Sequence, residues 1–269
     1  MLAAERHALI LDELNQRGVV RIAQLANNFD VSLMTIRRDI EILADQGLVY
    51  KVHGGATAKN DLAVLSEQPF RTKSLRETEA KEAIALYASG LVQPGASLAL
   101  MGGSTVFALA KLLVAIPRLT IVTNSLPISD LFHREGRTDH TVILAGGLRT
   151  PTDSFVGELT VSIFSRLNID LSFMGAHGFD LKGGFTSPNI LESETNRAVR
   201  DHARKMVVLA DHTKWGEVAF STFAQLGDVD VLVTDDGLDS DILERLNGVI
   251  SEVIIADKSS SSNPSERPQ

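Results

Sequence analysis

The sequence predicts two fold classes in one chain: a small winged helix-turn-helix domain, followed by an open, Rossmann-like α/β domain. Two observations lead to this prediction. Apolar residues recur at helical spacing in three short segments within residues 1–46, whereas from residue 77 apolar strand patterns alternate with helical lengths. The expected boundaries are 1–57 for the winged domain, 58–76 for a linker, 77–258 for the α/β domain and 259–269 for a serine-rich, disordered tail.

The first two helices and the turn after them follow from local residue types. Ile10 and Leu14 predict a first apolar helix, and the apolar residues within 22–29 predict a second. A turn at Asp30-Val31 then leads into a third helix. Ser32 is expected to cap that helix by accepting a hydrogen bond from a free backbone N–H of the first turn.

The third helix is expected to present two arginines to solvent. Ile36, Ile40 and Leu43 recur at spacings of four and three, which predicts its buried stripe. At about 100° per residue, Arg37 and Arg38 then project away from the core. A last helix of this kind docks in the major groove of DNA, where arginine pairs with guanine or phosphate. A solvated helix face is the alternative interpretation.

A strand pattern and a tight turn follow the third helix. Residues 48–52 alternate as in a strand, and His53-Gly54-Gly55 predicts the turn of a wing. Lys51 and His53 are then expected to contact backbone phosphates, which fixes position on the duplex without reading sequence. An ordinary turn histidine is the alternative for His53.

The charge is divided unequally along the chain. Residues 1–60 hold seven of the 26 Lys and Arg residues and seven of the 34 Asp and Glu residues, so the net charge of -8 belongs to the remainder. The larger domain is therefore not expected to bind DNA. A neutral DNA-binding domain makes few phosphate contacts, which predicts binding of operator half-sites by at least two copies, as a homodimer or homotetramer.

Composition narrows the remaining classes. The chain has no cysteine, which excludes disulfides, zinc fingers and thiolate metal sites. It has 44% apolar residues but no run of eighteen of them, and no cleavable signal pattern. We therefore expect a cytoplasmic protein with no membrane partner.

The second domain is expected to have a largely parallel sheet. In such a sheet ligands bind outside the carboxyl ends of the strands, so the residues after each strand matter most. Here those residues are glycines, hydroxyl-bearing residues, amides and one lysine, which together outline a pocket for a polyol and a phosphate. The alternative for each piece is helix capping or a simple turn. The expected strands are 97–101, 119–122, 141–145, 170–174, 206–210, 229–233 and 252–256.

Several of these motifs resemble the DeoR-type (deoxyribose-operon repressor) family of bacterial transcription regulators, over residues 5 to about 256. The resemblance implies an N-terminal DNA-binding domain and a C-terminal sensor domain, similar in fold to sugar-phosphate isomerases, that senses phosphorylated sugars. The N-terminal signature is Val31-Ser32, Thr35-Ile36-Arg37-Arg38-Asp39, Gly47-Leu48 and His53-Gly54-Gly55-Ala56, and the sensor resemblance covers 153–157, 170–178, 184–186 and 209–214.

The predicted function is a repressor of sugar or carbohydrate metabolism genes whose operator binding is controlled by a phosphorylated sugar. No resident cofactor, metal or catalytic residue is expected. The predicted DNA-binding residues are Ser32, Thr35, Arg37, Arg38, Lys51 and His53. The predicted effector-binding residues are Gly103, Ser104, Thr105, Asn124, Ser125, Gly146, Gly147, Asp211 and Lys214, with Lys214 as the phosphate partner. Met101 stands where family members commonly have aspartate, which leaves an altered effector open.

Two alternatives use the same domain differently. A sugar-phosphate isomerase fused to a DNA-binding domain would need a base, for which Glu192, Asp211 and His177 are candidates. A metal-dependent regulator would need His177, His202 and His212, but the chain has no cysteine and no pair of histidines four residues apart. Both alternatives rank below the effector-controlled regulator.

Overall fold

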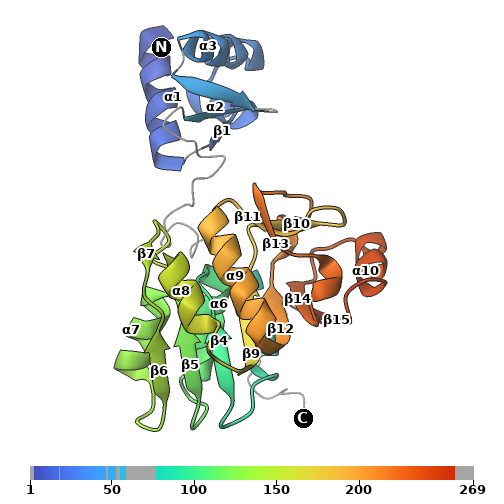
Figure 1. Cartoon of the computed structure of the whole chain (residues 1–269). Helices are drawn as coiled ribbons and strands as arrows, with labels where there is room; N and C mark the ends of the chain where they lie inside the picture. Colours follow the sequence, from blue (N-terminus) through green and yellow to red (C-terminus); the bar gives the residue numbers. More distant parts are fainter. Residues whose placement is uncertain (1–2, 18, 47, 53–54, 59–76, 258–269) are drawn as a thin grey trace. The chain divides into compact units, whose positions relative to one another are not determined.

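The computed structural model describes residues 3–17, 19–46, 48–52, 55–58 and 77–257. By internal contacts the chain divides into two units, Met1–Gln68 and Pro69–Gln269. Each unit has its own buried apolar residues. Figure 1 shows the helices and strands of each unit. No helix in the described ranges is long and apolar enough to cross a membrane.

The N-terminal unit is a winged helix-turn-helix. The three expected helices are present, and a small antiparallel sheet in the order β1-β3-β2 packs beside them. Its first strand was not expected from the sequence, because three residues directly after a helix carry too little periodicity. The elements are α1 (Ala3–Arg17), β1 (Val19–Arg21), α2 (Ile22–Phe29), α3 (Leu33–Asp45), β2 (Val49–Val52) and β3 (Gly55–Ala58).

Local chemistry sets the turn between α2 and α3. Asp30 adopts a left-handed conformation with φ of 52°, which a short polar side chain tolerates, and the Val31 N–H donates to Ala26 O at 3.0 Å. The predicted apolar stripe of α3 is confirmed, since Ile36 and Ile40 are buried against α1. The orientation of α3 is therefore fixed by packing.

The second unit contains one seven-stranded sheet in which every pair of neighbours is parallel. The seven strands expected from the sequence are these seven, with ends shifted by a few residues. The strand order is β15-β14-β12-β9-β4-β5-β6. The chain adds β5 and β6 on one side of β4 and the later strands on the other, so the topological switch point lies between β4 and β9, where open α/β sheets bind ligands. The strands are β4 (Ser97–Leu100), β5 (Thr120–Thr123), β6 (Thr141–Leu144), β9 (Ile169–Gly175), β12 (Ala203–Leu209), β14 (Val231–Asp235) and β15 (Glu252–Ala256).

Helices cover both faces of this sheet (Figure 1). Alternate residues of the strands point to opposite faces, so Leu98 and Leu100 of β4 belong to one core and Ala99 to the other. The first core includes residues of α5 (Thr78–Ser89), α6 (Ser104–Leu113) and α7 (Leu126–Glu135). The second includes residues of α8 (Glu158–Phe164), α9 (Ile190–His202) and α10 (Ser240–Asn247).

Two small antiparallel sheets were not expected from the sequence. One has the order β10-β11-β13, and the other is the pair β7-β8. Their strands are only two to four residues long, so neither length nor periodicity marks them in the sequence. They are β7 (Leu148–Arg149), β8 (Phe155–Val156), β10 (Gly178–Asp180), β11 (Gly184–Ser187) and β13 (Ser221–Ala224).

Candidate functional site

The exposed face of α3 carries the two predicted arginines. Arg37 and Arg38 are both exposed, and Met34, one turn earlier, is 70% exposed. The predicted cap is present, since Ser32 Oγ accepts from the Thr35 N–H at 3.1 Å, and the Ser32 and Thr35 hydroxyls lie 2.8 Å apart. This face therefore presents two guanidinium groups and a thioether, beside a capped helix start. Met34 was not predicted as a contact, and its exposed side chain in the first turn of the helix suits contact with a thymine methyl group.

A buried ion pair holds α3 against α1. Arg6 on α1 donates to both carboxylate oxygens of Asp39, at 2.7 and 2.9 Å, and His7 Nε2 lies 3.0 Å from the same carboxylate. Burial raises the pKa of Asp39, but hydrogen bonds and charge from Arg6 and His7 outweigh it, so the pKa lies below its ordinary value. Asp39 is thus the inward-facing neighbour of the two exposed arginines.

The wing contains the other two predicted DNA contacts. Lys51 lies in β2, opposite Ala56 of β3. His53 lies outside the described residues, as does the linker between the units. The structure therefore places the backbone of Lys51 on the wing and leaves both contacts as predictions.

The effector residues predicted after β4 and β5 lie together. The Gly102 N–H donates to Asn124 Oδ1 at 2.9 Å, and Asn124 Nδ2 donates to Phe155 O at 2.8 Å. Ser125 Oγ accepts from the Ile128 N–H and caps α7. Asn124 thereby joins the turn before α6 to the start of β8, and these residues form one wall at the strand ends.

The helix after β4 is different, because no described side chain caps it. Gly103 is the N-cap of α6, and Ser104 and Thr105 form its first turn. The side chain of Ser154 faces this turn: a Cβ atom on Gly102 would lie 1.9 Å from Ser154 Oγ. Ser154 is 1% exposed, and its hydroxyl has no hydrogen-bond partner among the described residues. Free helix N–H groups and an unsatisfied hydroxyl together favour an anionic ligand.

The turn after β6 is tightly packed. A Cβ atom on Gly147 would lie 2.3 Å from Thr160 Oγ1 and 2.6 Å from Val156 O, while the Thr160 hydroxyl donates to Gly146 O at 2.9 Å. At Gly146 an added Cβ would meet nothing within 4 Å. Of these two predicted residues, Gly146 therefore has free space beside its Cα and Gly147 has none.

The last two predicted effector residues lie after β12, on the other side of the topological switch point between β4 and β9. Asp211 is 1% exposed and caps the short helix His212–Lys214 by accepting from Thr213. Lys214 is half-buried at the end of that helix. Between them, His212 is held by buried Asp235 at the end of β14, with its Nδ1 2.7 Å from Asp235 Oδ2. No hydrogen bond joins this cluster to the α6 turn among the described residues.

The residues of the two alternative functions come from different elements. Glu192 accepts from the Ser187 hydroxyl in the first turn of α9. His202 bonds to Ala198 O at the end of the same helix, whereas His177 follows β9. Within the described ranges, no three His, Asp or Glu side chains are grouped as metal ligands.

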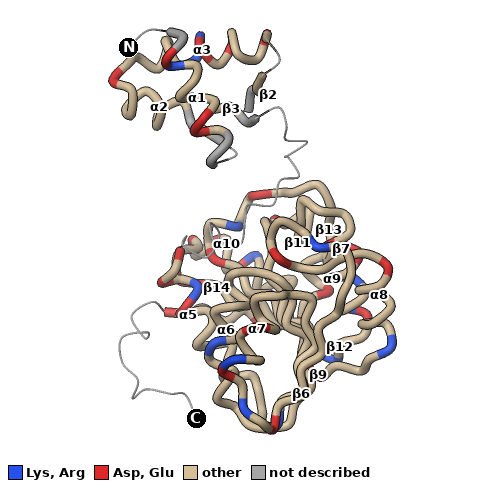
Figure 2. The backbone as a smooth tube through the Cα atoms, turned by 90° about the vertical axis from the view of Figure 1, so that its left-hand side faces the viewer, with Lys and Arg blue, Asp and Glu red and all other residues tan. Residues whose placement is uncertain are grey.

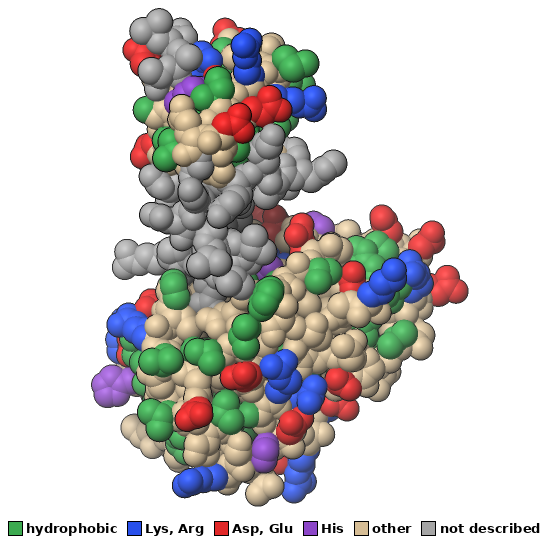
Figure 3. Space-filling model, turned by 45° about the horizontal axis from the view of Figure 1, so that its top comes forward, with side chains coloured by type: hydrophobic (Ala, Val, Ile, Leu, Met, Phe, Trp, Pro, Cys, Tyr) green, Lys and Arg blue, Asp and Glu red, His purple; other side chains and the backbone are tan. Residues whose placement is uncertain are grey.

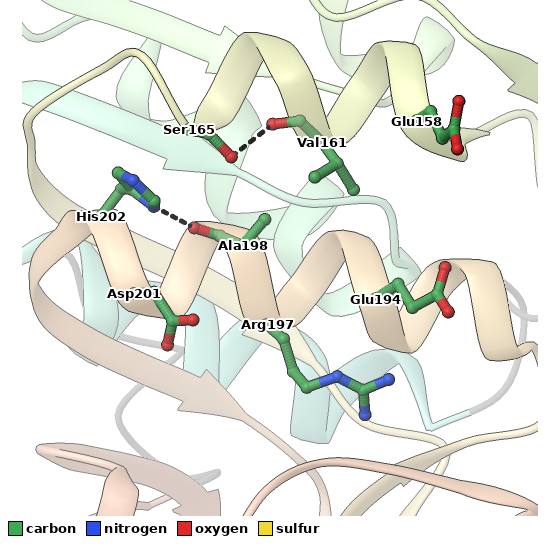
Figure 4. A pocket seen from close by; sticks show the side chains of 8 residues that line it. All are labelled: Glu158, Val161, Ser165, Glu194, Arg197, Ala198, Asp201 and His202. Carbon is green, nitrogen blue, oxygen red and sulfur yellow. Dashed lines mark hydrogen bonds between the residues drawn. The ribbon is translucent and has the colours of Figure 1, made fainter.

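A separate hollow lies between α8 and α9. Figure 4 shows that its polar groups do not converge: the Ser165 hydroxyl donates to Val161 O and His202 bonds to Ala198 O, each within its own helix. Arg197 donates to Thr222 O. A site that recognises a small polar ligand needs convergent groups, so the strand ends are the better candidate.

One prediction tests the packing of the α6 turn. Gly102→Ala would force Ser154 to shift, because its Cβ would also lie 2.9 Å from Ser154 Cβ, so we expect a loss of about 1–3 kcal/mol in unfolding free energy. Urea unfolding followed by the single tryptophan, Trp215, measures this domain alone. The matched control is Gly146→Ala, another glycine after a strand but in open space. Equal stability of the two variants would contradict the close approach.

Comparison with known families decides the identity. Residues 6–62 match the family described as the DeoR-like helix-turn-helix domain, and residues 76–236 match the DeoR C terminal sensor domain. The chain belongs to the DeoR family of transcriptional regulators. In this DeoR-family regulator the helix-turn-helix binds DNA and the α/β domain is the sensor. Its relatives are regulators and not enzymes, so the isomerase alternative is set aside.

Individual relatives span nearly the whole chain. The HTH-type transcriptional regulator GolR of Listeria innocua is 34% identical over 262 residues, covering 96% of this chain and 100% of the relative. The glycerol-3-phosphate regulon repressor of Escherichia coli is 32% identical over 237 residues, covering 87% and 92%. Among solved structures, ribose 5-phosphate isomerase A from Methanocaldococcus jannaschii is similar with a TM-score of 0.37 and 17% identity, covering 50% of this chain and 53% of that one.

Proposed function

We propose that this DeoR-family regulator is a repressor of genes for carbohydrate metabolism, and that a phosphorylated sugar bound to its sensor domain releases it from its operator. Two relatives support the direction of control, since they are named as the glycerol-3-phosphate regulon repressor and the putative aga operon transcriptional repressor, both of Escherichia coli. Arg37 and Arg38 would bind bases or phosphates, with Ser32, Thr35, Lys51 and His53 supplying further contacts to the backbone.

The observation that supports the effector most strongly is the uncapped start of α6 beside the unpartnered Ser154 hydroxyl. The neighbouring helix α7 is capped by its own Ser125. A phosphate bound at α6 would accept from the backbone N–H groups of Ser104 and Thr105 and from Ser154, and the helix dipole would favour its negative charge. The same groups give a neutral sugar less binding energy, which predicts a phosphorylated effector.

The second part of the proposed pocket lies on the β12 side of the topological switch point between β4 and β9. Neighbouring strands are about 4.8 Å apart, so the ends of β4 and β12, with β9 between them, are separated by roughly 10 Å. A sugar phosphate spans much of that distance. We assign Lys214 and Asp211 to its far end, the lysine to an anionic oxygen and the carboxylate to a hydroxyl group, with Gly146 and Gly147 on the outer wall.

Release requires a difference in binding free energy between two states of the protein. The effector weakens DNA binding only if it favours an arrangement that docks less well on the operator half-sites. A coupling of about 1–3 kcal/mol changes operator affinity from several-fold to about 100-fold. This size of effect is measurable in a simple titration.

The test is a titration of the full chain onto labelled DNA from its own upstream region. It is done at fixed salt, with and without a panel of sugar phosphates and their unphosphorylated parents. Specific binding that one phosphorylated sugar weakens, and its parent does not, is the expected result. Binding that no member of the panel changes, or that only parent sugars change, would overturn the effector assignment.

Lys214→Ala is expected to separate sensing from DNA binding. Removing the ammonium group removes a charge-assisted bond to the ligand. The concentration of the active sugar phosphate that releases the operator should therefore rise about ten-fold or more. Operator affinity without effector should not change. The neighbouring Trp215 gives a direct fluorescence signal for ligand binding. Lys111→Ala, at an exposed lysine of α6, is the matched control, and a normal response of Lys214→Ala would exclude Lys214 from the pocket.

A further inference from the structure

The edge strand β6 differs from the other strands of the parallel sheet. All four of its residues are exposed, and three of them are large and apolar: Val142 is 36% exposed, Ile143 37% and Leu144 37%. β5 pairs with one side of β6, and no described strand pairs with the other. The sequence predicts a strand over 141–145 but not its position at the edge of the sheet. Half of its backbone polar groups therefore point outward beside exposed apolar side chains.

This apolar surface continues beyond the strand. Leu148 in β7 is 64% exposed and Leu159 in α8 is 72% exposed. Figure 3 shows hydrophobic side chains gathered on the left-hand side of the α/β domain, where Figure 1 places β6, β7 and α8. We call Val142, Ile143, Leu144, Leu148 and Leu159 the β6 strip.

The opposite edge of the sheet is protected in a way that β6 is not. On β15, the charged Glu252 lies 3.6 Å from Lys205 of β12, and Ile255 is the only described residue of that strand among the exposed large apolar ones. Charges on an edge strand discourage pairing with another chain. Residues 140–148 contain no Asp, Glu, Lys or Arg. An open, uncharged apolar edge is a template for strand pairing.

The charges around the β6 strip favour a second copy of this chain as the partner. The chain carries a net charge of -8, and charged groups of both signs are spread over the α/β domain (Figure 2), so two copies repel over most contacts. At the two ends of the strip, Arg137 is paired with Asp139 at 2.9 Å and Arg149 with Asp153 at 2.6 Å. These pairs are neutral overall, so two strips meet without a net charge on either side.

We propose that β6 pairs with β6 of a second copy and joins the two sensor sheets across a two-fold axis. An axis perpendicular to the sheet runs the two strands antiparallel, so the outward backbone groups of each satisfy the other. The same two-fold rotation places the β6 strip of one chain against the β6 strip of the other. The inference deepens the proposed function, because recognition of two operator half-sites needs two copies, and it identifies the surface that joins them.

The absence of cysteine in the natural chain allows a sharp test. In an antiparallel pair centred on β6, one residue of the strand faces itself across the axis, at a Cα distance of about 4.5–5.5 Å that a disulfide can span. Val142→Cys and Ile143→Cys, each as the sole cysteine, are oxidised gently without DNA or sugar phosphate. At least one should give a reducible, covalent dimer. The matched control is Ile255→Cys on the opposite edge, which should stay a single chain.

A second measurement uses charge instead of crosslinking. Ile143→Lys should lower the mass found by light scattering toward the 29.1 kDa of one chain, whereas Ile255→Lys should keep the wild-type mass. Circular dichroism shows whether each variant is folded. If Ile143→Lys does not fold, the cysteine variants still test the interface. Dimers formed equally by Ile255→Cys, no dimer from either β6 variant, or a wild-type mass for folded Ile143→Lys would overturn the proposal. Because DNA is absent, none of these results depends on operator binding.

Discussion

Replacing Arg38 with alanine is expected to abolish specific operator binding and to leave sugar-phosphate binding unchanged. Arg38 is exposed on α3 while its neighbour Asp39 is buried, so the guanidinium group is free to reach a base edge or phosphate. A bidentate contact with a base supplies about 1–3 kcal/mol of discrimination, and a pair of subunits loses this contact twice. A gel-shift titration against specific and unrelated DNA measures the loss.

Arg38→Lys is the matched control for this experiment. It keeps the positive charge but cannot make the two parallel bonds of a guanidinium group. If Arg38 reads a base, the lysine variant should bind all DNA with similar, weak affinity and keep the salt dependence of the wild type. If it contacts only phosphate, the lysine variant should retain specific binding. Loss of sugar-phosphate binding in Arg38→Ala would contradict the separation of the two sites.

Breaking the buried ion pair between α1 and α3 should have the largest effect on stability. Arg6→Met removes both bonds that the guanidinium group donates to Asp39. It leaves this residue, 3% exposed in the wild type, with His7 as its other partner in the described ranges. Stranding a buried charge in this way costs about 3–5 kcal/mol. The N-terminal domain should therefore unfold at lower urea, and operator binding should be lost with it.

Two observations separate this effect from general damage. Trp215 lies in the sensor domain, so its fluorescence transition should not move, while the far-UV circular dichroism gains an earlier step. The double variant Arg6→Met with Asp39→Leu should recover stability relative to Arg6→Met, because no buried charge remains. A double variant as unstable as the single one would show that Arg6 acts through packing and not through its charge.

The same pair predicts an acid dependence. Because the pKa of Asp39 is lowered in the folded state, its carboxylate stabilises the N-terminal domain fully above the ordinary Asp range. That contribution is lost as the pH falls through the lowered pKa. In Arg6→Met, burial without the guanidinium group should raise the pKa of Asp39 and favour its protonated form. The acid-dependent loss should therefore shrink or reverse, and the gap between the wild-type and variant urea midpoints should narrow as the pH falls. Parallel pH profiles would contradict this assignment.

The sequence predicted those parts of the fold that depend on local pattern. The three helices of the N-terminal unit and the seven strands of the sheet have strong apolar periodicity, and the structure confirms them. The sheets β10-β11-β13 and β7-β8 were missed because their strands, of two to four residues, are too short to show a period. The edge position of β6 was not predicted, since sequence alone does not say which apolar strand lies at an edge.

The site shows the same division. Polar residues after strands could be named in advance, because parallel strands end at a common edge, and the structure brings Gly103 near Asn124 in this way. Ser154 was not named, since it follows no predicted strand and reaches the α6 turn only through the β7-β8 connection. Asp39 stood out in the family signature, but its burial depends on Arg6, 33 residues earlier. The roles of the effector residues stay predictions.

The central place of β4 in the sheet also sets the order in which the newly made chain folds. β4 is the first strand of the seven-stranded sheet to be synthesised, yet one of its two neighbours, β9, pairs with it across 73 residues, as the bond between Ser97 and Asp170 shows. Contacts of such separation form late, whereas those that close the N-terminal domain span fewer residues, such as the 33 between Arg6 and Asp39. At roughly 5–20 residues per second on the ribosome, the DNA-binding domain is complete about 10–40 s before the last strand of the sensor sheet. Each new molecule is thus able to fold its DNA-binding domain before its sensor domain has been synthesised in full.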